Sequence, residues 1–309
     1  IVDASVGLII TNHHVVADAS QITVRLSDDR SLRAKLLGSD PGTDIALLQV
    51  EAENLVEIDF ADVSTVAVGD YVVAIGNPFG IGQTVTSGIV SALGRAGINN
   101  DNYEDFIQTD AAINRGNSGG ALVDMEGRLI GINTAIISGS GGSNGIGFAV
   151  PTDMVATVME HLRRDGEVRR GLLGVTIADA TPDIVAALDV EVDYGAVVTS
   201  VMPDSAADKA GVQVSDVIVG IDGEEVNGSR QLRNRVGLML QEQQVELALY
   251  RNGKRETLQA RIGGASGQAV AADSLDVVNK EFRGAMLETT RGNNSLVKQG
   301  VEVVSLSQS

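Results

Sequence analysis

Short runs of apolar and β-branched residues recur along the first half of the chain, each bounded by turn residues. They follow one another closely, without long amphipathic helices between them, and this spacing is typical of an antiparallel barrel or sandwich. The predicted strands span Val6–Thr11, Ile22–Leu26, Ile45–Val50, Tyr71–Ile75, Thr84–Val90, Leu129–Thr134 and Ile146–Val150. The pattern therefore predicts an all-β first domain.

A helical pattern replaces the strands after Pro151, and Gly166 provides its C-terminal stop. Apolar residues recur at the spacing that places them on one helix face. They are Met154, Val155, Val158, Met159 and Leu162. We place the first domain boundary after this helix, so that the first domain spans residues 1–168.

Residues 169–263 mix strands with two helical stretches, which indicates a compact α+β module. Strands are predicted at Gly195–Val201, Val217–Ile221 and Val245–Tyr250, and one helix at Ser205–Ala210. A second helix runs from Ser229 to about Gln241, with Leu232, Val236 and Leu240 spaced by four.

A stretch of small residues, 264–274, is typical of a linker. Beyond it, Gly300–Leu306 resembles the strand pattern of Gly195–Val201. We therefore expect residues 275–309 to begin a second, incomplete copy of the α+β module. The first residues show no initiator methionine and no leader-like charged region, so we expect the chain to begin inside a longer sequence.

Charge and composition exclude several classes of function. The chain has 41 acidic and 23 basic residues, a net charge of −18, which would repel nucleic acid and anionic membrane surfaces. No apolar run approaches the ~20 residues of a membrane-spanning helix. Cysteine is absent, which excludes disulfides, thiol catalysis and thiolate metal sites. No Gly-rich phosphate loop ending in Lys-Ser or Lys-Thr is present to support nucleotide use.

Three histidines are available for acid–base chemistry. His161 lies late in the predicted helix beside Arg163 and Arg164, and we expect it on a solvated face. His13 and His14 lie where an apolar strand ends, a position from which an imidazole that titrates near neutrality can act as general base. A purely structural role for this pair is the alternative.

Ser118 lies in the glycine-rich stretch Gly116-Asn117-Ser118-Gly119-Gly120. Glycines on both sides allow backbone conformations in which amides converge beside an exposed hydroxyl, as acyl transfer requires. A flexible turn is the alternative interpretation. The stretch does not match the nucleophile elbow of strand-to-helix hydrolases, because no helical pattern follows it.

A carboxylate is needed to orient a histidine base. Asp44 immediately precedes a predicted buried strand and is well placed for this role. The residues alone do not decide between it and other aspartates along the first domain, which are Asp40, Asp59, Asp62, Asp70 and Asp110.

Four motifs in this order resemble the HtrA/Deg family of serine proteases, in particular its periplasmic DegP/DegQ branch. They are Thr11–Val16, Thr43–Leu48, Val73–Pro78 and Gly116–Leu122, and the likeness continues through Gln83–Ser91 and Phe106–Asn114. The resemblance covers nearly the whole chain. It implies an all-β chymotrypsin-like double β-barrel protease domain, an α+β PDZ domain and a truncated second PDZ-like segment.

The resemblance implies that His14 is the general base, Asp44 its orienting acid and Ser118 the nucleophile. This chain order, His then Asp then Ser, is that of chymotrypsin-like proteases. The amides of Gly116 and Ser118, with the Asn117 peptide between them, would form the oxyanion hole. His13 is then the neighbour of the base.

Family analogy also points to the pocket and loops around this site. Ile113 and either Ile136 or Ile137 would line a primary specificity pocket suited to small aliphatic side chains. The segments expected to switch between ordered and disordered states are Leu93–Asp105, Ala111–Asn117 and Ala135–Gly145.

In the PDZ-like module the resemblance assigns peptide binding to Gly171–Val175, including Leu172, Leu173, Gly174 and Val175. Leu232, Val236 and Leu240 would form the opposite wall, although core packing is an alternative for these residues. Such modules add the ligand as an extra strand and hold its carboxylate with backbone amides. Ser215 departs from the family pattern, which usually has glycine there. If the turn needs a left-handed backbone, serine costs ~1–2 kcal/mol; otherwise the turn itself differs.

The function implied is ATP-independent, metal-independent and cofactor-free endoproteolysis of unfolded or misfolded proteins in the bacterial periplasm. The PDZ domain would bind hydrophobic carboxyl termini, and the protein would assemble as trimers or larger cages, with chaperone activity. The alternative is mainly a chaperone or peptide-binding scaffold with minor proteolysis.

Overall fold

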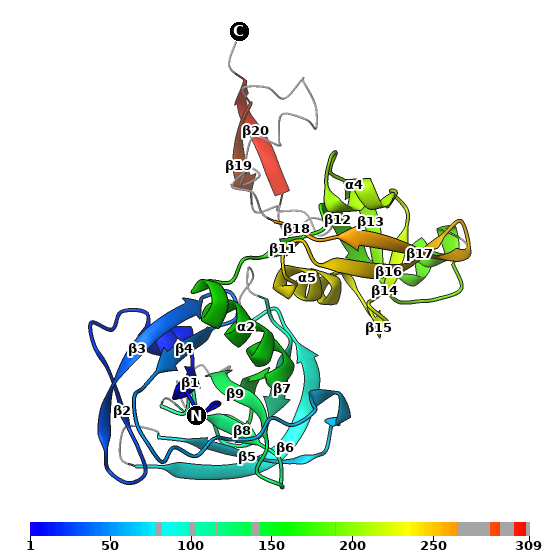
Figure 1. The fold of residues 1–309 in the computed structure, drawn as a ribbon. Coiled ribbons are helices and arrows are strands. Elements are labelled where there is room, and N and C mark those ends of the chain that lie inside the picture. Colours follow the sequence, from blue (N-terminus) through cyan, green and yellow to red (C-terminus); the bar gives the residue numbers. More distant parts are fainter. Residues whose placement is uncertain are drawn as a thin grey trace. The chain divides into compact units, whose positions relative to one another are not determined.

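A four-stranded antiparallel sheet opens the fold, in the spatial order β1-β4-β3-β2 (Figure 1). The structure, a computed structural model, describes residues 1–77, 82–98, 103–114, 116–136, 143–188, 190–264, 285–290 and 300–306. The strands are β1 (Leu8–Thr11), β2 (Ile22–Arg25), β3 (Ser31–Asp40) and β4 (Ile45–Gln49). The short helix α1 (His13–Val16) directly follows β1. Four consecutive residues of β4 are buried, which makes β4 the centre of this lobe.

Six further strands close into a barrel in the order β10-β7-β6-β5-β8-β9. They are β5 (Tyr71–Gly76), β6 (Thr84–Arg95), β7 (Phe106–Thr109), β8 (Ala121–Val123), β9 (Leu129–Ile136) and β10 (Gly147–Pro151), and the 3₁₀ turn η1 (Val63–Thr65) precedes them. This closed barrel is one of the two lobes expected for the protease domain. The first lobe is an open sheet, because its end strands β1 and β2 do not pair with each other in the described residues.

Helix α2 (Thr152–Asp165) confirms the predicted helix and its stop, since Gly166 adopts a left-handed φ of 75°. Met154, Val155, Val158 and Leu162 are buried in the core between the two lobes. One expectation was wrong: His161 is 1% exposed. It lies on the buried side because α2 is covered there by a second helix, from the following module, and no pattern within α2 reveals that partner.

That module contains a sheet in the order β12-β13-β14-β16-β17, with β15 paired to β14. The strands are β12 (Val175–Asp179), β13 (Ala196–Val201), β14 (Val217–Ile221), β15 (Glu224–Glu225), β16 (Gln244–Arg251) and β17 (Lys254–Arg261). Three helices join them, α3 (Pro182–Ala187), α4 (Ala206–Ala210) and α5 (Ser229–Leu238), and β11 (Gly171–Leu172) pairs with β18 (Gly263–Gly264).

Helix α5 is shorter than predicted. It ends at Leu238, and Met239 is already extended. Leu240 therefore lies beyond the helix and does not continue the face formed by Leu232 and Val236. Leu232 and Val236 are themselves buried in the core of the module.

Ser215 has a φ of 75°, so the turn does need the left-handed conformation in which glycine is usual.

The first 264 residues form one compact unit, and polar contacts fasten the module to the β-rich domain. Arg170 forms a bidentate pair with Asp40 at 2.6 and 2.8 Å and stacks on Tyr103, with 4.0 Å from its guanidinium carbon to the ring centroid. Asn234 donates to the Glu104 carbonyl at 2.7 Å. His161 Nε2 lies 2.9 Å from the carbonyl oxygen of Leu238 at the end of α5.

A separate unit contains two antiparallel strands, β19 (Ala285–Thr290) and β20 (Gly300–Leu306). β20 coincides with the strand expected from the repeat. The linker beyond Gly264 lies outside the described residues. The longest described helix, α2, has 14 residues, and none of the described helices is both long and apolar enough to cross a membrane.

Candidate active site

His14 and Asp44 are locked together at the seam between β1 and β4. The Asp44 carboxylate accepts a hydrogen bond from the His14 amide at 2.9 Å, and its other oxygen lies 2.7 Å from His14 Nδ1. The Asp44 carbonyl accepts from the His13 amide at 3.1 Å and from Asn12 Nδ2 at 2.9 Å. These contacts fix the imidazole with Nδ1 toward the carboxylate, which leaves Nε2 free for a proton transfer.

Asp44 adopts a left-handed φ of 58°, which is uncommon for a residue other than glycine. Aspartate tolerates this region better than most residues, and the contacts with residues 12 to 14 hold it there. The strained position lets the carbonyl and the carboxylate of one residue both face the segment that carries the histidine.

The electrostatics of the pair match a base and its orienting acid. The hydrogen bond that His14 donates to Asp44 raises the pKa of His14; burial opposes this, and the Asp44 charge adds a smaller upward effect. Burial alone would raise the pKa of Asp44, but hydrogen bonds from His14 and Thr134 outweigh it and lower that pKa. Asp44 is therefore ionised near neutral pH, where it stabilises a charged imidazole.

Tight backbone packing shapes the loop that carries Ser118. Gly119 has a φ of 80°, and a Cβ there would clash with Thr11 at the end of β1. Paired backbone hydrogen bonds of 2.9 Å join Gly119 and Gly120 to Asn133 on β9. The glycines therefore bring the serine loop against both the histidine segment and β9, while Ser118 itself is only half-buried.

Thr134 on β9 links the serine to the aspartate. Its carbonyl accepts a hydrogen bond from Ser118 Oγ at 3.2 Å, and its hydroxyl donates to the Asp44 carboxylate at 2.5 Å. Sequence reasoning missed this residue, because Thr134 lies 90 residues from Asp44 and ends a predicted strand without a signal of its own. Only the position of β9 beside the loop reveals it.

The hydroxyl of Ser118 donates to Thr134 rather than to His14, and no hydrogen bond joins Ser118 to His14 in the described residues. The amide of Asn117 donates to Asn114, whereas those of Gly116 and Ser118 donate no hydrogen bond within the described part of the chain. The two amides that the sequence assigns to the oxyanion hole are thus available.

The residues expected to line the specificity pocket have different surroundings in the structure. Ile113 is 2% exposed and packs in the barrel core against Gly147. Ile136 ends β9 and pairs with Gly147, whereas Ile137 lies outside the described residues. The expected switching loops fall partly outside them as well, at 99–102, 115 and 137–142.

The rival aspartates have other roles. Asp40 pairs with Arg170, Asp62 caps η1, and Asp70 and Asp110 accept from nearby backbone amides. Among the described residues, Asp59 accepts a hydrogen bond only through its backbone carbonyl, from the Leu129 amide. Within the described residues, no three histidine or carboxylate side chains lie close enough to hold a metal ion.

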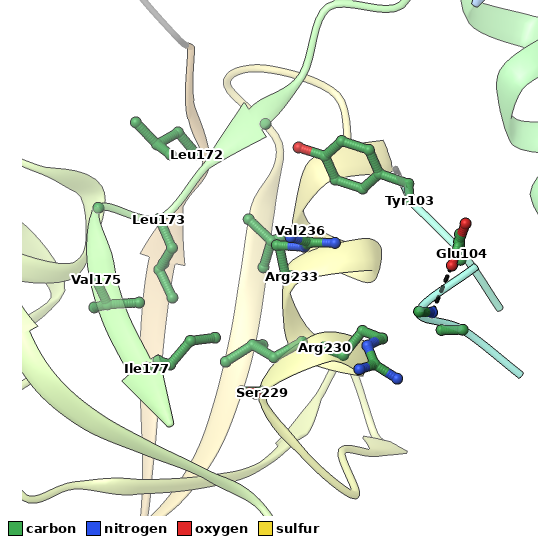
Figure 2. A pocket seen from close by; sticks show the side chains of 15 residues that line it. Tyr103, Glu104, Leu172, Leu173, Val175, Ile177, Ser229, Arg230, Arg233 and Val236 are labelled. Carbon is green, nitrogen blue, oxygen red and sulfur yellow. Dashed lines mark hydrogen bonds between the residues drawn. The ribbon is translucent and has the colours of Figure 1, made fainter. Parts of the chain in front are cut away.

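A second candidate site is a pocket of about 550 Å³ between β12 and α5 (Figure 2). β12 lies at the edge of its sheet, so one side of it has no partner strand there. Leu173, Val175 and Ile177 form one apolar wall, and Leu232 and Val236 the opposite one. Tyr103 and Glu104 of the β-rich domain also line the pocket, and Figure 2 places them across α5 from β12.

Comparisons with known proteins agree with this arrangement. The trypsin-like peptidase domain family matches residues 1–132, and the PDZ domain family matches residues 171–262. The solved structure "HtrA-type protease AlgW with tripeptide" is 46% identical, with a TM-score of 0.71, over 85% of this chain and 87% of that one. The chain belongs to the HtrA-type serine proteases.

Two curated HtrA relatives extend the match. Periplasmic serine endoprotease DegP of Salmonella typhimurium is 45% identical over 98% of this chain and 66% of its own length. Periplasmic pH-dependent serine endoprotease DegQ of Escherichia coli is 46% identical over 89% of this chain and 61% of its own. The chain thus spans slightly less than two thirds of the length of these curated relatives.

The two family matches assign each candidate site to a domain. The histidine–aspartate pair lies within the region matched by the peptidase family, as does Ser118. The pocket between β12 and α5 lies within the PDZ match, apart from its lining by Ala96, Gly97, Tyr103 and Glu104. Thr134 falls two residues beyond the end of the peptidase match, so a domain match alone does not include it.

Proposed function

We propose that this chain is a serine endopeptidase in which His14, Asp44 and Ser118 form the catalytic triad. The observation that carries the proposal is the two-point contact between His14 and Asp44, connected to Ser118 through Thr134. Oxyanion stabilisation is assigned to the amides of Gly116 and Ser118. Ile113 and Ile136 or Ile137 are assigned to the specificity pocket on family grounds.

Catalysis proceeds by acyl transfer. Ser118 Oγ attacks the scissile carbonyl carbon, and His14 Nε2 takes the hydroxyl proton while Asp44 stabilises the imidazolium. The carbonyl oxygen becomes an oxyanion that accepts hydrogen bonds from the two amides. When the tetrahedral intermediate collapses, the C–N bond breaks and His14 gives its proton to the leaving amine. Water then attacks the acyl ester by the same route and releases Ser118.

Ser118 has to turn before it can attack, because its hydroxyl donates to the Thr134 carbonyl. A rotation of the side chain exchanges this acceptor for His14 Nε2. Such hydrogen bonds are often incomplete in ligand-free proteases and form in the substrate complex.

The proposed substrates are unfolded or misfolded proteins in the periplasm, cleaved without ATP. Support comes from the relatives DegP and DegQ, which are periplasmic serine endoproteases. Residues 169–263 would act as a PDZ domain that binds hydrophobic carboxyl termini along β12. A related solved structure is described as holding a decapeptide. Residues 1–168 would be the protease domain, 264–274 a linker and 275–309 the start of a second PDZ domain, with assembly as trimers or larger cages.

The test combines active-site labelling with substrate cleavage. A fluorophosphonate probe should label the chain and leave Ser118→Ala unlabelled, and that variant should not degrade an unfolded casein-like substrate. Ser64→Ala, which changes an exposed serine of η1, is the matched control and should keep both properties. Cleavage by Ser118→Ala would remove Ser118 as the nucleophile.

A chaperone role is the second candidate, favoured by a peptide-sized pocket that is separate from the triad. Ser118→Ala should then still suppress aggregation of an unfolded client in light scattering. Failure to do so would confine the proposed function to proteolysis.

A further inference from the structure

One of the four motifs that resemble the HtrA/Deg family holds no residue of the proposed triad. This motif is Val73–Pro78. Its described part, Val73–Asn77, forms the end of β5 and the residue that follows it. β5 pairs with β8, and β8 begins at Ala121, directly after the glycine-rich loop. The end of β5 therefore lies beside residues 116–120, the serine loop, which carries Ser118.

Backbone contacts join the end of β5 to both ends of the serine loop. The Asn77 amide donates a hydrogen bond to the Gly116 carbonyl at 3.2 Å. At the other end of the loop, a Cβ on Gly120 would clash with the Ile75 carbonyl oxygen, so the two backbones are in direct contact there. Gly76 lies between the two β5 residues that make these contacts.

Space, rather than backbone conformation, requires glycine at position 76. The φ of Gly76 lies outside the left-handed region. A Cβ there would lie 2.6 Å from the Cα of Asn117 and would clash with its side-chain oxygen. The Asn117 side chain cannot easily move away, because it is 1% exposed and its Nδ2 donates to the Ala112 carbonyl at 3.4 Å. Gly76 is thus part of the surface on which Asn117 packs.

The peptide bond between Asn117 and Ser118 carries one of the two proposed oxyanion donors. The Asn117 amide donates to the Asn114 carbonyl at 2.9 Å, and the Asn117 carbonyl accepts from the Gly120 amide at 3.0 Å. A trans peptide is planar, and its N–H and C=O point in opposite directions. The hydrogen bond from Gly120 therefore also sets the direction of the Ser118 amide, which donates no hydrogen bond within the described residues.

We propose that Gly76 is a positioning residue for the oxyanion hole. The absence of a side chain at this position lets Asn117 pack on the end of β5, and the packed Asn117 holds the next peptide so that the Ser118 amide is directed at the oxyanion. The three atoms nearest to a Cβ at position 76 all belong to Asn117, so a side chain there would act through that residue. The proposal rests on the proposed protease function and gives the motif Val73–Pro78 a part in it.

The test compares Gly76→Ala with the unaltered full chain in the hydrolysis of an unstructured chromogenic peptide. Turning one oxyanion donor away should lower kcat by about 10²-fold and change KM by less than about threefold, because the amide stabilises the transition state rather than the bound substrate. A peptide boronate binds as a tetrahedral adduct in which Ser118 Oγ is bonded to boron and a boron oxygen takes the place of the oxyanion. Its affinity should fall by a similar factor. Unchanged kcat and boronate affinity would overturn the proposal.

Gly131→Ala is the matched control. Gly131 lies in β9 of the same barrel, and a Cβ there would lie 2.9 Å from the Val150 carbonyl oxygen of β10, rather than against the serine loop. This variant should lower the thermal unfolding midpoint, because overpacking costs stability, but it should leave kcat unchanged. A fall in kcat equal to that of Gly76→Ala would make strain in the barrel the cause and would overturn the positioning role.

Asn117→Ala keeps the test decisive if Gly76→Ala does not fold. It removes the packed side chain without a clash and should lower kcat with KM unchanged, and full kcat in this variant would overturn the proposal. The double variant should lose little more than the larger single variant, because both changes act through one peptide, whereas additive losses would overturn the proposal. An unaltered chain that neither hydrolyses the peptide nor binds the boronate would overturn the protease function itself, and this inference with it.

Discussion

The proposed triad and the proposed peptide groove of this HtrA-type chain are built in opposite ways. Around the triad, the polar groups are fixed by short contacts among β1, β4 and β9, several of them to the backbone. The groove is lined by β11 and β12, by α5, and by Ala96, Gly97, Tyr103 and Glu104 of the other domain. The proposed catalysis depends on a local network of hydrogen bonds, whereas the proposed peptide recognition depends on a junction between two domains.

Among the tests of the hydrogen-bonded pair of His14 and Asp44, the substitution Asp44→Asn is expected to have the largest effect. It keeps the shape of the side chain but removes the charge that stabilises the imidazolium and selects the tautomer, so kcat/KM should fall by about 10⁴. Hydrolysis of an unstructured chromogenic peptide measures it. Asp62→Asn, which removes a charge at η1, should leave the rate unchanged; a similar fall there would mean that general destabilisation is the cause.

Thr134→Val tests whether the bridge positions the triad. It leaves the Asp44 carboxylate without the hydroxyl donor, an effect of about 1–1.5 kcal/mol or roughly tenfold in kcat/KM. Thr134→Ser keeps the donor and should restore most of the activity. Equal loss in both variants would assign Thr134 a packing role only.

The pH dependence of activity tests the electrostatic interaction between His14 and Asp44. Asp44 raises the pKa of His14, and the base works only when neutral. Activity should therefore rise with pH through a midpoint above the ordinary histidine value near 6.5. The residual activity of Asp44→Asn should rise at a lower pH than this. A midpoint below 6.5 in the unaltered chain would contradict the pairing seen between His14 and Asp44.

The substitution His161→Phe tests the junction between α2 and α5. This removes the donor to the Leu238 carbonyl and leaves that buried group unpaired, so the chain should lose about 1–2 kcal/mol of unfolding free energy. Urea denaturation measures the loss, and peptide affinity should fall as α5 loses support. Fluorophosphonate labelling should persist. His161→Gln keeps an N–H donor and is the matched control; a comparable loss there would mean that ring packing, rather than the hydrogen bond, matters.

The smallest expected effect is at the left-handed turn of Ser215. Ser215→Gly relieves a φ of 75° and should stabilise the PDZ-like module by about 0.5–1 kcal/mol. Ser200→Gly, in an exposed strand position of β13, should instead destabilise it. Thermal unfolding of both variants compares them, and a destabilised Ser215→Gly would mean that serine makes a compensating contact.

The sequence predicted many of the strands and the boundaries of α2, and it named the three residues of the proposed triad. It did so because the apolar positions of a buried strand or helix face recur at a fixed local spacing. In addition, each motif that carries a residue of the proposed triad is a contiguous stretch of the chain. The sequence pattern missed the long β3, where buried positions are scattered among exposed ones, and it extended α5 past Leu238 because Leu240 keeps the spacing of four. Periodicity cannot tell a helical leucine from one in the turn that follows.

The sequence by itself determined the family, the order His14, Asp44, Ser118 and the presence of two kinds of domain. The tertiary structure decided how these parts are connected. Thr134 reaches Asp44 across 90 residues, and His161 reaches Leu238 across 77. Such contacts depend on which strands and helices become neighbours, and the local pattern of apolar and polar residues contains no record of the partner.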